Sequence, residues 1–174
     1  PSSIKDAARA KAKELGNGDQ YAFTLHKPSL LPFLTFSPER ESREELYRAY
    51  LNRGNNNNEY DNKQIINDMI RLRTEQAKLL GYKSYAHYVT SDQMAATPKA
   101  VYTLLGEVWE PALERAREEL AEMEKMFKED YTDSEYKFES WDWWYYAEKV
   151  RQKKYALNED IIRGYFSLDN TRQG

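Results

Sequence analysis

The longest regular pattern of apolar positions in the chain covers residues 97–127. Apolar residues recur there every three or four positions, which places them on one side of a helix. They are Val101, Leu104, Leu105, Val108, Ala112, Leu113, Ala116, Leu120, Met123, Met126 and Phe127. Thr97 can cap the first amide groups, and Pro98 suits the first helical position. Because Pro111 removes one backbone hydrogen bond, the pattern predicts a long helix with a kink at Pro111.

The first 25 residues predict one helix and one extended segment. An alanine-rich helix is expected over residues 3–15, with Ser3 and Asp6 as a capping box and Gly16 as its stop. Residues 21–25 alternate large side chains on one face, which indicates a single strand. The sequence shows no convincing second strand, so this segment either lies along a helix or belongs to a sheet completed elsewhere.

Two helical patterns follow, interrupted by prolines. Residues 30–36 are almost wholly apolar and predict a short buried helical turn. A further helix is expected to begin at residues 37–39 and to end at Gly54. Its inner stripe is predicted to be Leu46, Tyr47, Tyr50 and Leu51. Residues 55–58 are all asparagine and indicate a polar loop.

The middle of the chain predicts a second amphipathic helix and a short one. Asp61 and Gln64 are expected to form a capping box, and Gly81 to close the helix. Its apolar side is predicted to be Ile65, Ile66, Met69, Ile70, Leu72, Ala77 and Leu80. Ser84 is expected to cap a short helix that runs through Val89.

After the long helix, residues 131–139 are polar and predicted to be irregular. Asp142 is expected to cap an aromatic helix to about Tyr155, and Asn158 to cap a last short helix anchored by Phe166 and Leu168. The long helix should pack against the helices that begin near residues 61 and 142. The predicted fold is all-α: a multi-helix array over residues 1–174, with a long kinked helix and at most one short extended segment.

Composition excludes several classes of protein. The chain has 26 basic and 29 acidic residues and a formal net charge of −3, which argues against nucleic acid or an anionic membrane as the main partner. No apolar run approaches the ~20 residues that cross a bilayer, and no segment near Pro1 resembles a signal peptide. The absence of cysteine excludes disulfides, thiolate nucleophiles and cysteine metal sites. A soluble protein of the cytoplasm or the periplasm is expected, with the compartment left open.

Candidate catalytic chemistry is sparse because the chain has only two histidines, His26 and His87. Neither belongs to a His-Glu-x-x-His or Glu-x-x-His pattern, and no Gly-x-Ser-x-Gly elbow or Gly-rich phosphate loop is present. His87 is interpreted as an ordinary hydrogen-bonded histidine. His26 is interpreted as a structural or surface residue, with a groove contact as the alternative. No catalytic, cofactor-binding or metal-ligating residue is therefore assigned.

Residues 141–146, of sequence Trp-Asp-Trp-Trp-Tyr-Tyr, are the most distinctive in composition. On a helix, Trp143, Tyr146 and Val150 share one face, while Tyr145 and Tyr155 share another. One interpretation is a helix packed on two sides, whose tyrosine hydroxyls find polar partners. The other is an aromatic wall that contacts a peptide or a sugar.

Several short motifs in this order resemble the zinc peptidases related to thimet oligopeptidase, most of all the bacterial dipeptidyl carboxypeptidase branch. The closest motif is Trp141-Asp142-x-x-Tyr145-Tyr146 with Glu148-Lys149-Val150-Arg151-Gln152 and Tyr155. Others are Phe23-Thr24-Leu25, Pro28-Ser29-Leu30, Pro32-Phe33, Tyr47-Arg48-Ala49-Tyr50, Leu79-Leu80-Gly81-Tyr82-x-Ser84-x-Ala86-x-Tyr88-Val89, Met94-Ala95, Thr97-Pro98 and Tyr165-Phe166-x-Leu168-Asp169. The related oligopeptidase branch is the alternative parent.

The resemblance implies that the parent is a zinc enzyme that releases dipeptides from the C-terminus of short peptides. Family members bind zinc through His-Glu-x-x-His and a distant glutamate; the metal polarises a water and the carbonyl, and the motif glutamate acts as base. Those residues lie downstream of the matched part, and none is present here. The chain is thus expected to be an internal fragment, a helical scaffold beside the substrate channel, inactive and without zinc by itself.

A second hypothesis is a free-standing helical module that binds peptides or a protein through its aromatic surface. Under the fragment hypothesis, part of the apolar surface should be left exposed. That patch is expected to include some of Phe33, Phe36, Trp143, Trp144, Tyr165 and Phe166 and to favour self-association. The expected partners are short peptides of the parent enzyme and the remainder of the parent chain.

Overall fold

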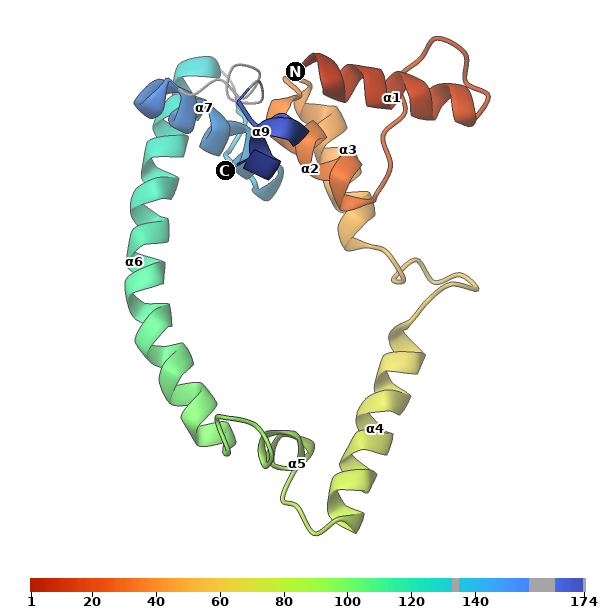
Figure 1. The fold of residues 1–174 in the computed structure, drawn as a ribbon, viewed down its shortest axis with the longest axis vertical. Helices are drawn as coiled ribbons and strands as arrows, with labels where there is room; N and C mark the ends of the chain where they lie inside the picture. Colours follow the sequence, from red (N-terminus) through yellow and green to blue (C-terminus); the bar gives the residue numbers. More distant parts are fainter. Residues whose placement is uncertain (133–134, 157–164, 174) are drawn as a thin grey trace. The chain divides into compact units, whose positions relative to one another are not determined.

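The computed structural model describes residues 1–132, 135–156 and 165–173, which form helices and connecting segments without a strand (Figure 1). The all-α prediction is therefore confirmed for these residues. The chain divides into two compact units. Unit 1 consists of Pro1–Leu51 and Glu119–Gly174, and unit 2 is Asn52–Glu118. None of the helices in the described ranges is long and apolar enough to cross a membrane.

The N-terminal part of unit 1 contains α1 (Ser2–Glu14), α2 (Lys27–Phe36) and α3 (Arg40–Leu51). Neighbouring helices in this series pack on one another, and Ala8, Ala12, Leu30 and Leu34 are buried between them. Gly16 follows α1 with a φ of 77°, which suits a glycine helix stop. The capping box predicted at Ser3 and Asp6 is wrong, because α1 starts one residue earlier and has no side-chain cap.

Residues 21–25 form an extended segment and not a strand. The Ala22 amide donates to the Ala8 carbonyl at 3.1 Å, and the Thr24 amide donates to Ser29 Oγ at 2.9 Å. The Phe23 ring lies 4.4 Å from that of Phe33. Of the two alternatives that the sequence left open, the structure supports a segment that lies along helices.

The C-terminal part of unit 1 combines the end of α6 (Pro98–Asp130) with the short 3-10 helix η1 (Ser140–Asp142) and with α7 (Trp143–Tyr155). Met123 and Phe127 of α6 form one buried cluster with Tyr146 of α7. The predicted packing of the long helix on the aromatic helix is thus confirmed. α7 also packs against α2, so this part of unit 1 closes onto its N-terminal part.

The chain end holds α9 (Leu168–Gln173). Phe166 and Leu168 are exposed, so the expectation that they anchor this end is wrong. The predicted cap Asn158 lies outside the described residues. Of the six aromatic residues expected to form an exposed patch, only Tyr165 and Phe166 are exposed; the other four are half-buried inside unit 1.

Unit 2 contains α4 (Lys63–Leu79), α5 (Tyr85–Thr90) and the first part of α6, which continues through Pro111. Ser84 accepts from the His87 amide and Thr97 from the Ala100 amide, as predicted for two helix caps. Asp61 Oδ1 accepts from the Lys63 amide at 3.0 Å. The predicted capping box is wrong nevertheless, because the Gln64 side chain donates to Asp68 instead.

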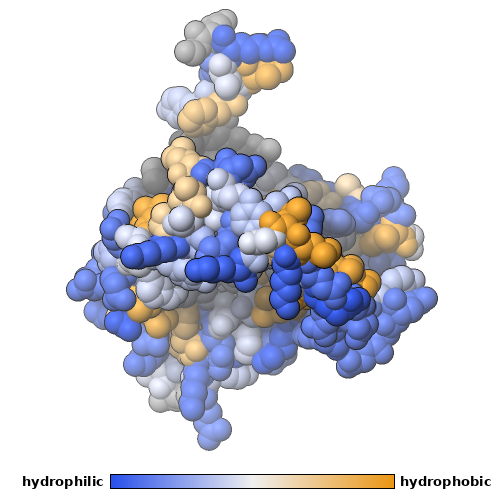
Figure 2. All heavy atoms as spheres, turned by 90° about the horizontal axis from the view of Figure 1, so that it is seen from below, coloured by the Kyte–Doolittle hydropathy of each residue, from blue (hydrophilic) through white to orange (hydrophobic). Residues whose placement is uncertain are grey.

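The apolar sides of α4 and α6 in unit 2 are largely exposed. α4 packs against α5, and Ala77 is the one fully buried apolar residue among the described residues of this unit. Packing of the long helix against α4, which the pattern predicted, is not found in the described part of the chain. Figure 2 shows apolar residues at the surface among charged ones on the face drawn there.

Candidate functional site

The centre of unit 1 is a buried carboxylate, Asp142, at the junction of η1 and α7. The backbone turn fixes it: Asp142 Oδ2 accepts from the Glu139 amide at 3.1 Å, and the Asp142 amide donates to the Glu139 carbonyl at 2.9 Å. The side chain is fully buried. It does not cap α7, as the sequence predicted, because its oxygens face two arginines of α3.

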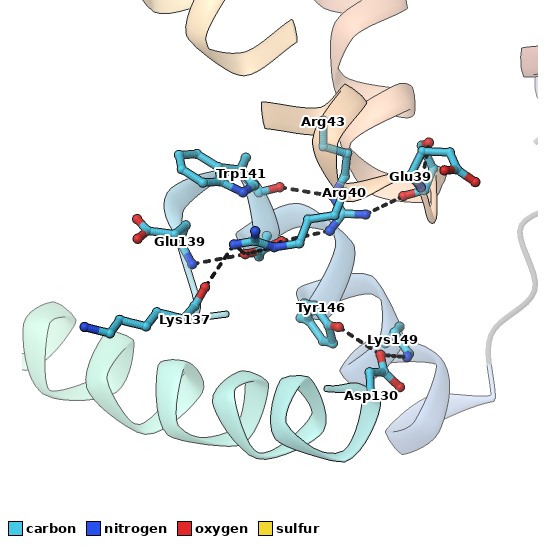
Figure 3. A network of polar contacts seen from close by, with 11 residues as sticks. Glu39, Arg40, Arg43, Asp130, Lys137, Glu139, Trp141, Tyr146 and Lys149 are labelled. Carbon is cyan, nitrogen blue, oxygen red and sulfur yellow. Dashed lines mark hydrogen bonds and ion pairs between the residues drawn. The ribbon is translucent and has the colours of Figure 1, made fainter. Parts of the chain in front are cut away.

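Arg40 and Arg43 hold the Asp142 carboxylate from α3. Figure 3 labels the two arginines. Arg40 donates through Nε to Oδ1 at 3.1 Å and through Nη2 to Oδ2 at 2.9 Å, while Arg43 Nη2 donates to Oδ1 at 2.8 Å. The remaining arginine donors reach backbone carbonyls: Arg43 those of Ser37 and Trp141, and Arg40 that of Lys137. A buried charged group is tolerated only when it is paired and hydrogen-bonded in this way.

Aromatic rings cover the guanidinium groups. The Arg43 Cζ atom lies 4.4 Å from the centroid of the Tyr145 ring. The Arg40 Cζ lies 4.8 Å from that of Tyr136 and 5.4 Å from that of Trp141. Such cation–π contacts are favourable when the cation is desolvated. The aromatic run therefore acts as a packed segment, the first of the two interpretations, and the rings of Trp141 and Tyr145 contact the chain's own arginines.

The hydrophobic pattern of the sequence did not indicate the role of the two arginines. It placed Leu46, Tyr47, Tyr50 and Leu51 on the inner stripe of α3, but Arg43 is the buried residue of that helix and Leu51 is exposed. Arg40, Arg43 and Tyr47 recur at helical spacing, which was the available signal. Arginine is usually exposed, so this signal is weak without knowledge of its carboxylate partner.

A second polar cluster, formed by Asp130, Tyr146 and Lys149, joins the end of α6 to α7 (Figure 3). Tyr146 donates its hydroxyl to Asp130 Oδ2 at 2.8 Å, and Lys149 Nζ donates to the same oxygen. Partial burial opposes ionisation of Asp130, but the hydrogen bonds from Lys149 and Tyr146 outweigh it and lower its pKa. Burial, followed by donation to Asp130, raises the pKa of the Tyr146 phenol.

The two histidines occupy different units. The Ser84 hydroxyl and His87 Nδ1 lie 2.8 Å apart, which agrees with an ordinary hydrogen-bonded histidine. The backbone carbonyl of His26 accepts from the Ser29 and Leu30 amides at the start of α2. The exposed His26 side chain lines an open groove of about 480 Å³ between α1 and α2, with Lys11 and Phe23 among its other lining residues.

The described residues do not fit the zinc ion that the family resemblance implies. Among them, no group of three or more histidine, cysteine, aspartate or glutamate side chains could hold a metal. The clustered carboxylates are instead occupied by arginine and lysine partners. No step of peptide hydrolysis is therefore assigned to a residue of this chain.

Comparison with known proteins identifies the family. Residues 33–174 match peptidase family M3. The chain belongs to this family. Dipeptidyl carboxypeptidase of Salmonella typhimurium is 34% identical over 173 residues, which cover 99% of this chain and 25% of that protein. Oligopeptidase A of Haemophilus influenzae is 35% identical over 178 residues, which cover all of this chain and 26% of that protein.

Membership of family M3 confirms the resemblance found in the sequence motifs. Dipeptidyl carboxypeptidase of Escherichia coli is also similar, at 33% identity over 93% of this chain. Identity is thus nearly the same to proteins of both names. The chain spans about a quarter of the length of these curated relatives.

Proposed function

We propose that residues 1–174 are one helical section of a longer zinc peptidyl-dipeptidase, which releases dipeptides from the C-terminus of short peptides. The observation that carries the proposal is the match to family M3 over residues 33–174, together with similarity to dipeptidyl carboxypeptidases over 93–99% of this chain. Oligopeptidase activity of the parent is the alternative, since oligopeptidase A is equally similar.

Within the parent, this section is a scaffold beside the substrate channel and supplies neither zinc ligands nor the catalytic base. We propose that this section contributes by holding its helices in fixed positions through polar clusters. The Asp142 carboxylate and its two arginines connect α3 to the start of α7, and the Asp130 cluster connects α6 to the same helix. Zinc, bound by other segments, supplies the Lewis acid of the reaction.

The test compares the isolated chain with the product of the gene that contains it. Each is incubated with a series of short peptides, and the products are separated by mass spectrometry. We expect the longer protein to release C-terminal dipeptides in a reaction that a chelator abolishes and zinc restores, and the isolated chain to release none. Internal cleavage without dipeptide release would assign the oligopeptidase alternative. Dipeptide release by the isolated chain would overturn the scaffold role.

A second candidate function is a free-standing module that binds peptides or a second protein, and the exposed apolar residues of unit 2 favour it. It requires that the isolated chain stay folded and self-associate or bind through that surface. Light scattering of the isolated chain at several concentrations measures this. A monodisperse dimer that binds short peptides, and a gene product without peptidase activity, would favour the module over the fragment.

A further inference from the structure

We infer that the apolar sides of α4 and of the first part of α6 form an interface with segments of the parent peptidase that lie outside this chain. The inference rests on the proposed function and adds which surface of the chain the rest of the enzyme covers. The surface belongs to unit 2, whereas the sequence alone placed the exposed patch mainly on aromatic residues of unit 1.

The evidence on α4 is a wide apolar side without a partner. Its five large apolar residues in the first three turns are Ile65, Ile66, Met69, Ile70 and Leu72. All five are exposed; Ile66 and Ile70, on the same face, have exposed fractions of 52% and 58%. At helical spacing the five cover about half of the helix circumference. A soluble helix places such a side against a core.

The first part of α6 repeats the arrangement. Leu104, Leu105, Val108 and Trp109 lie within one side of the helix and are all exposed. Trp109, at 63% exposure, is the largest of them. Exposed patches of this size on a monomer mark an interaction surface, because burying apolar area stabilises by roughly 25 cal/mol per Å².

The opposite sides of the same helices carry the charges. On α6, Glu110 and Glu114 lie opposite the apolar residues by helical spacing. On α4, Arg71 lies between Asp68 and Glu75, at 3.6 and 3.0 Å. These i,i+3 and i,i+4 pairs are typical of a solvated helix surface. Each helix therefore has a polar side suited to solvent and an apolar side suited to burial against another part of the protein.

The size of the relatives identifies what covers the apolar sides. Dipeptidyl carboxypeptidase and oligopeptidase A contain about four times the length that this chain matches. A parent protein of that length thus has enough further residues to bury the apolar sides of both helices. The alternative is that a second copy of this chain covers the apolar sides, and thiol labelling distinguishes the two possibilities.

Thiol accessibility tests the interface, because the chain has no cysteine of its own. Single cysteines are introduced at Ile66 and at Val108 on the apolar sides, and Lys78→Cys on the exposed polar side of α4 serves as the matched control. Each is made in the isolated chain and in the longer gene product. Labelling by a bulky maleimide is followed by mass mapping of the peptide that carries the introduced thiol. Hydrogen exchange of unsubstituted α4 in both proteins provides a measurement that does not depend on a substitution.

In the gene product, we expect labelling of Ile66→Cys and Val108→Cys to be at least ~10-fold slower than in the dilute isolated chain, with Lys78→Cys unchanged. Equal labelling in both proteins, or a gene product no longer than this chain, would overturn the inference. A third outcome would also overturn the inference: the introduced thiols become protected in the isolated chain as its concentration rises, and they are no better protected in the gene product. A second copy of this chain would then be what covers the apolar sides. Protection in a gene product that lacks peptidase activity would overturn the proposed function and leave the interface standing.

Discussion

Unit 1 and unit 2 are both built from amphipathic helices, but they differ in what covers the inner sides of those helices. In unit 1, α2, α3 and α7 pack on one another, and Leu30, Leu34 and Tyr146 are almost completely buried. In unit 2, the apolar residues of α4 and α6 remain exposed, and Ala77 alone is fully buried among its described residues. The same α6 takes part in both arrangements, so the helix itself does not determine the difference.

The two units differ in whether segments that are distant in sequence pack against their helices. Unit 1 joins two segments that are separated in sequence by unit 2. The buried ion network, in which Arg43 and Asp142 are 99 residues apart, lies where they meet. Unit 2 is continuous in sequence, and within the described part of the chain α4 packs only against α5. A regular hydrophobic pattern thus shows that a helix side is made for burial without showing that its partner lies in the same chain section.

Loss of the Asp142 carboxylate should give the largest difference in stability between a substitution in unit 1 and one in unit 2. Asp142→Ala leaves the buried Arg43 and the partly buried Arg40 without their counter-ion, and we expect the free energy of unfolding of unit 1 to fall by about 3–5 kcal/mol. Glu118→Ala, which removes an exposed pair partner of Arg115 in unit 2, should cost no more than about 1 kcal/mol. Urea denaturation followed by circular dichroism measures both. If Asp142→Ala does not fold, Asp142→Asn provides the milder variant; equal small losses for the two sites would show that the network does not stabilise unit 1.

The same substitution in both units compares their cores directly. Leu34 has an exposed fraction of 1% in unit 1, and Leu105 has 56% in unit 2. Leu34→Ala should lower the free energy of unfolding of the isolated chain by about 2–5 kcal/mol, and Leu105→Ala by about 0.5 kcal/mol or less. Thermal denaturation of the two variants measures the difference. In the longer gene product, the cost of Leu105→Ala should rise; a cost that stays small would contradict the proposed interface.

Unit 1 should contribute to the pH dependence of stability at both ends of the pH range, whereas in unit 2 the pKa of Asp61 is lowered by the hydrogen bond from the Lys63 amide. The pKa of Asp130 and that of Glu148 are lowered in the folded chain, because hydrogen bonds from Lys149 and from Arg151 outweigh burial. Their stabilisation is present above the unfolded pKa values of about 4 and is lost as pH falls further. The raised pKa of Tyr146 has the opposite consequence: stability falls by roughly 1.4 kcal/mol per pH unit above about 10.

Tyr146→Phe isolates the alkaline part of this profile. It removes the titrating phenol but keeps the buried ring, so stability measured by urea denaturation between pH 9 and pH 11 should vary less with pH than in the unsubstituted chain. An unchanged slope above about pH 10 would assign the alkaline loss to other groups.

The smallest expected effects concern two glycines with positive φ. Gly54 has a φ of 71°, and a Cβ there would lie 2.5 Å from Asn62 Nδ2, whereas Gly16 has a φ of 77° and open space around it. Gly16→Ala should cost about 1 kcal/mol through backbone conformation alone. Gly54→Ala should cost a few tenths more unless the Asn62 side chain moves, and a Gly54→Ala, Asn62→Ala double variant removes that contact. Equal costs for the two single variants would show that the side chain moves freely.

Local chemistry made much of the fold predictable from the sequence. The long helix, its cap at Thr97 and the cap at Ser84 depend on residues within one turn, and the structure confirms them. The ion network was not predictable in this way, because Arg43 and Asp142 meet only after the chain has returned to unit 1. Asp142 also occupies a position that suits a helix cap, so the local pattern favoured the wrong partner. Of the aromatic residues expected to form an exposed patch, Tyr165 and Phe166 are exposed. The exposed apolar sides of α4 and α6 were not predicted, because periodicity does not reveal which apolar side finds a partner.

The return of the chain to unit 1 has a consequence for synthesis on the ribosome. Arg43 and Asp142 are 99 residues apart, so α3 is made well before the carboxylate that neutralises its buried arginine. At about 5–20 residues per second, the interval is on the order of 5–20 seconds, far longer than a helix takes to form. During that time α3 is an amphipathic segment whose Arg43 lacks its carboxylate partner, while α4 and α5 can already associate locally. Native pairing between the two segments of unit 1 therefore begins only after unit 2 has been completely translated.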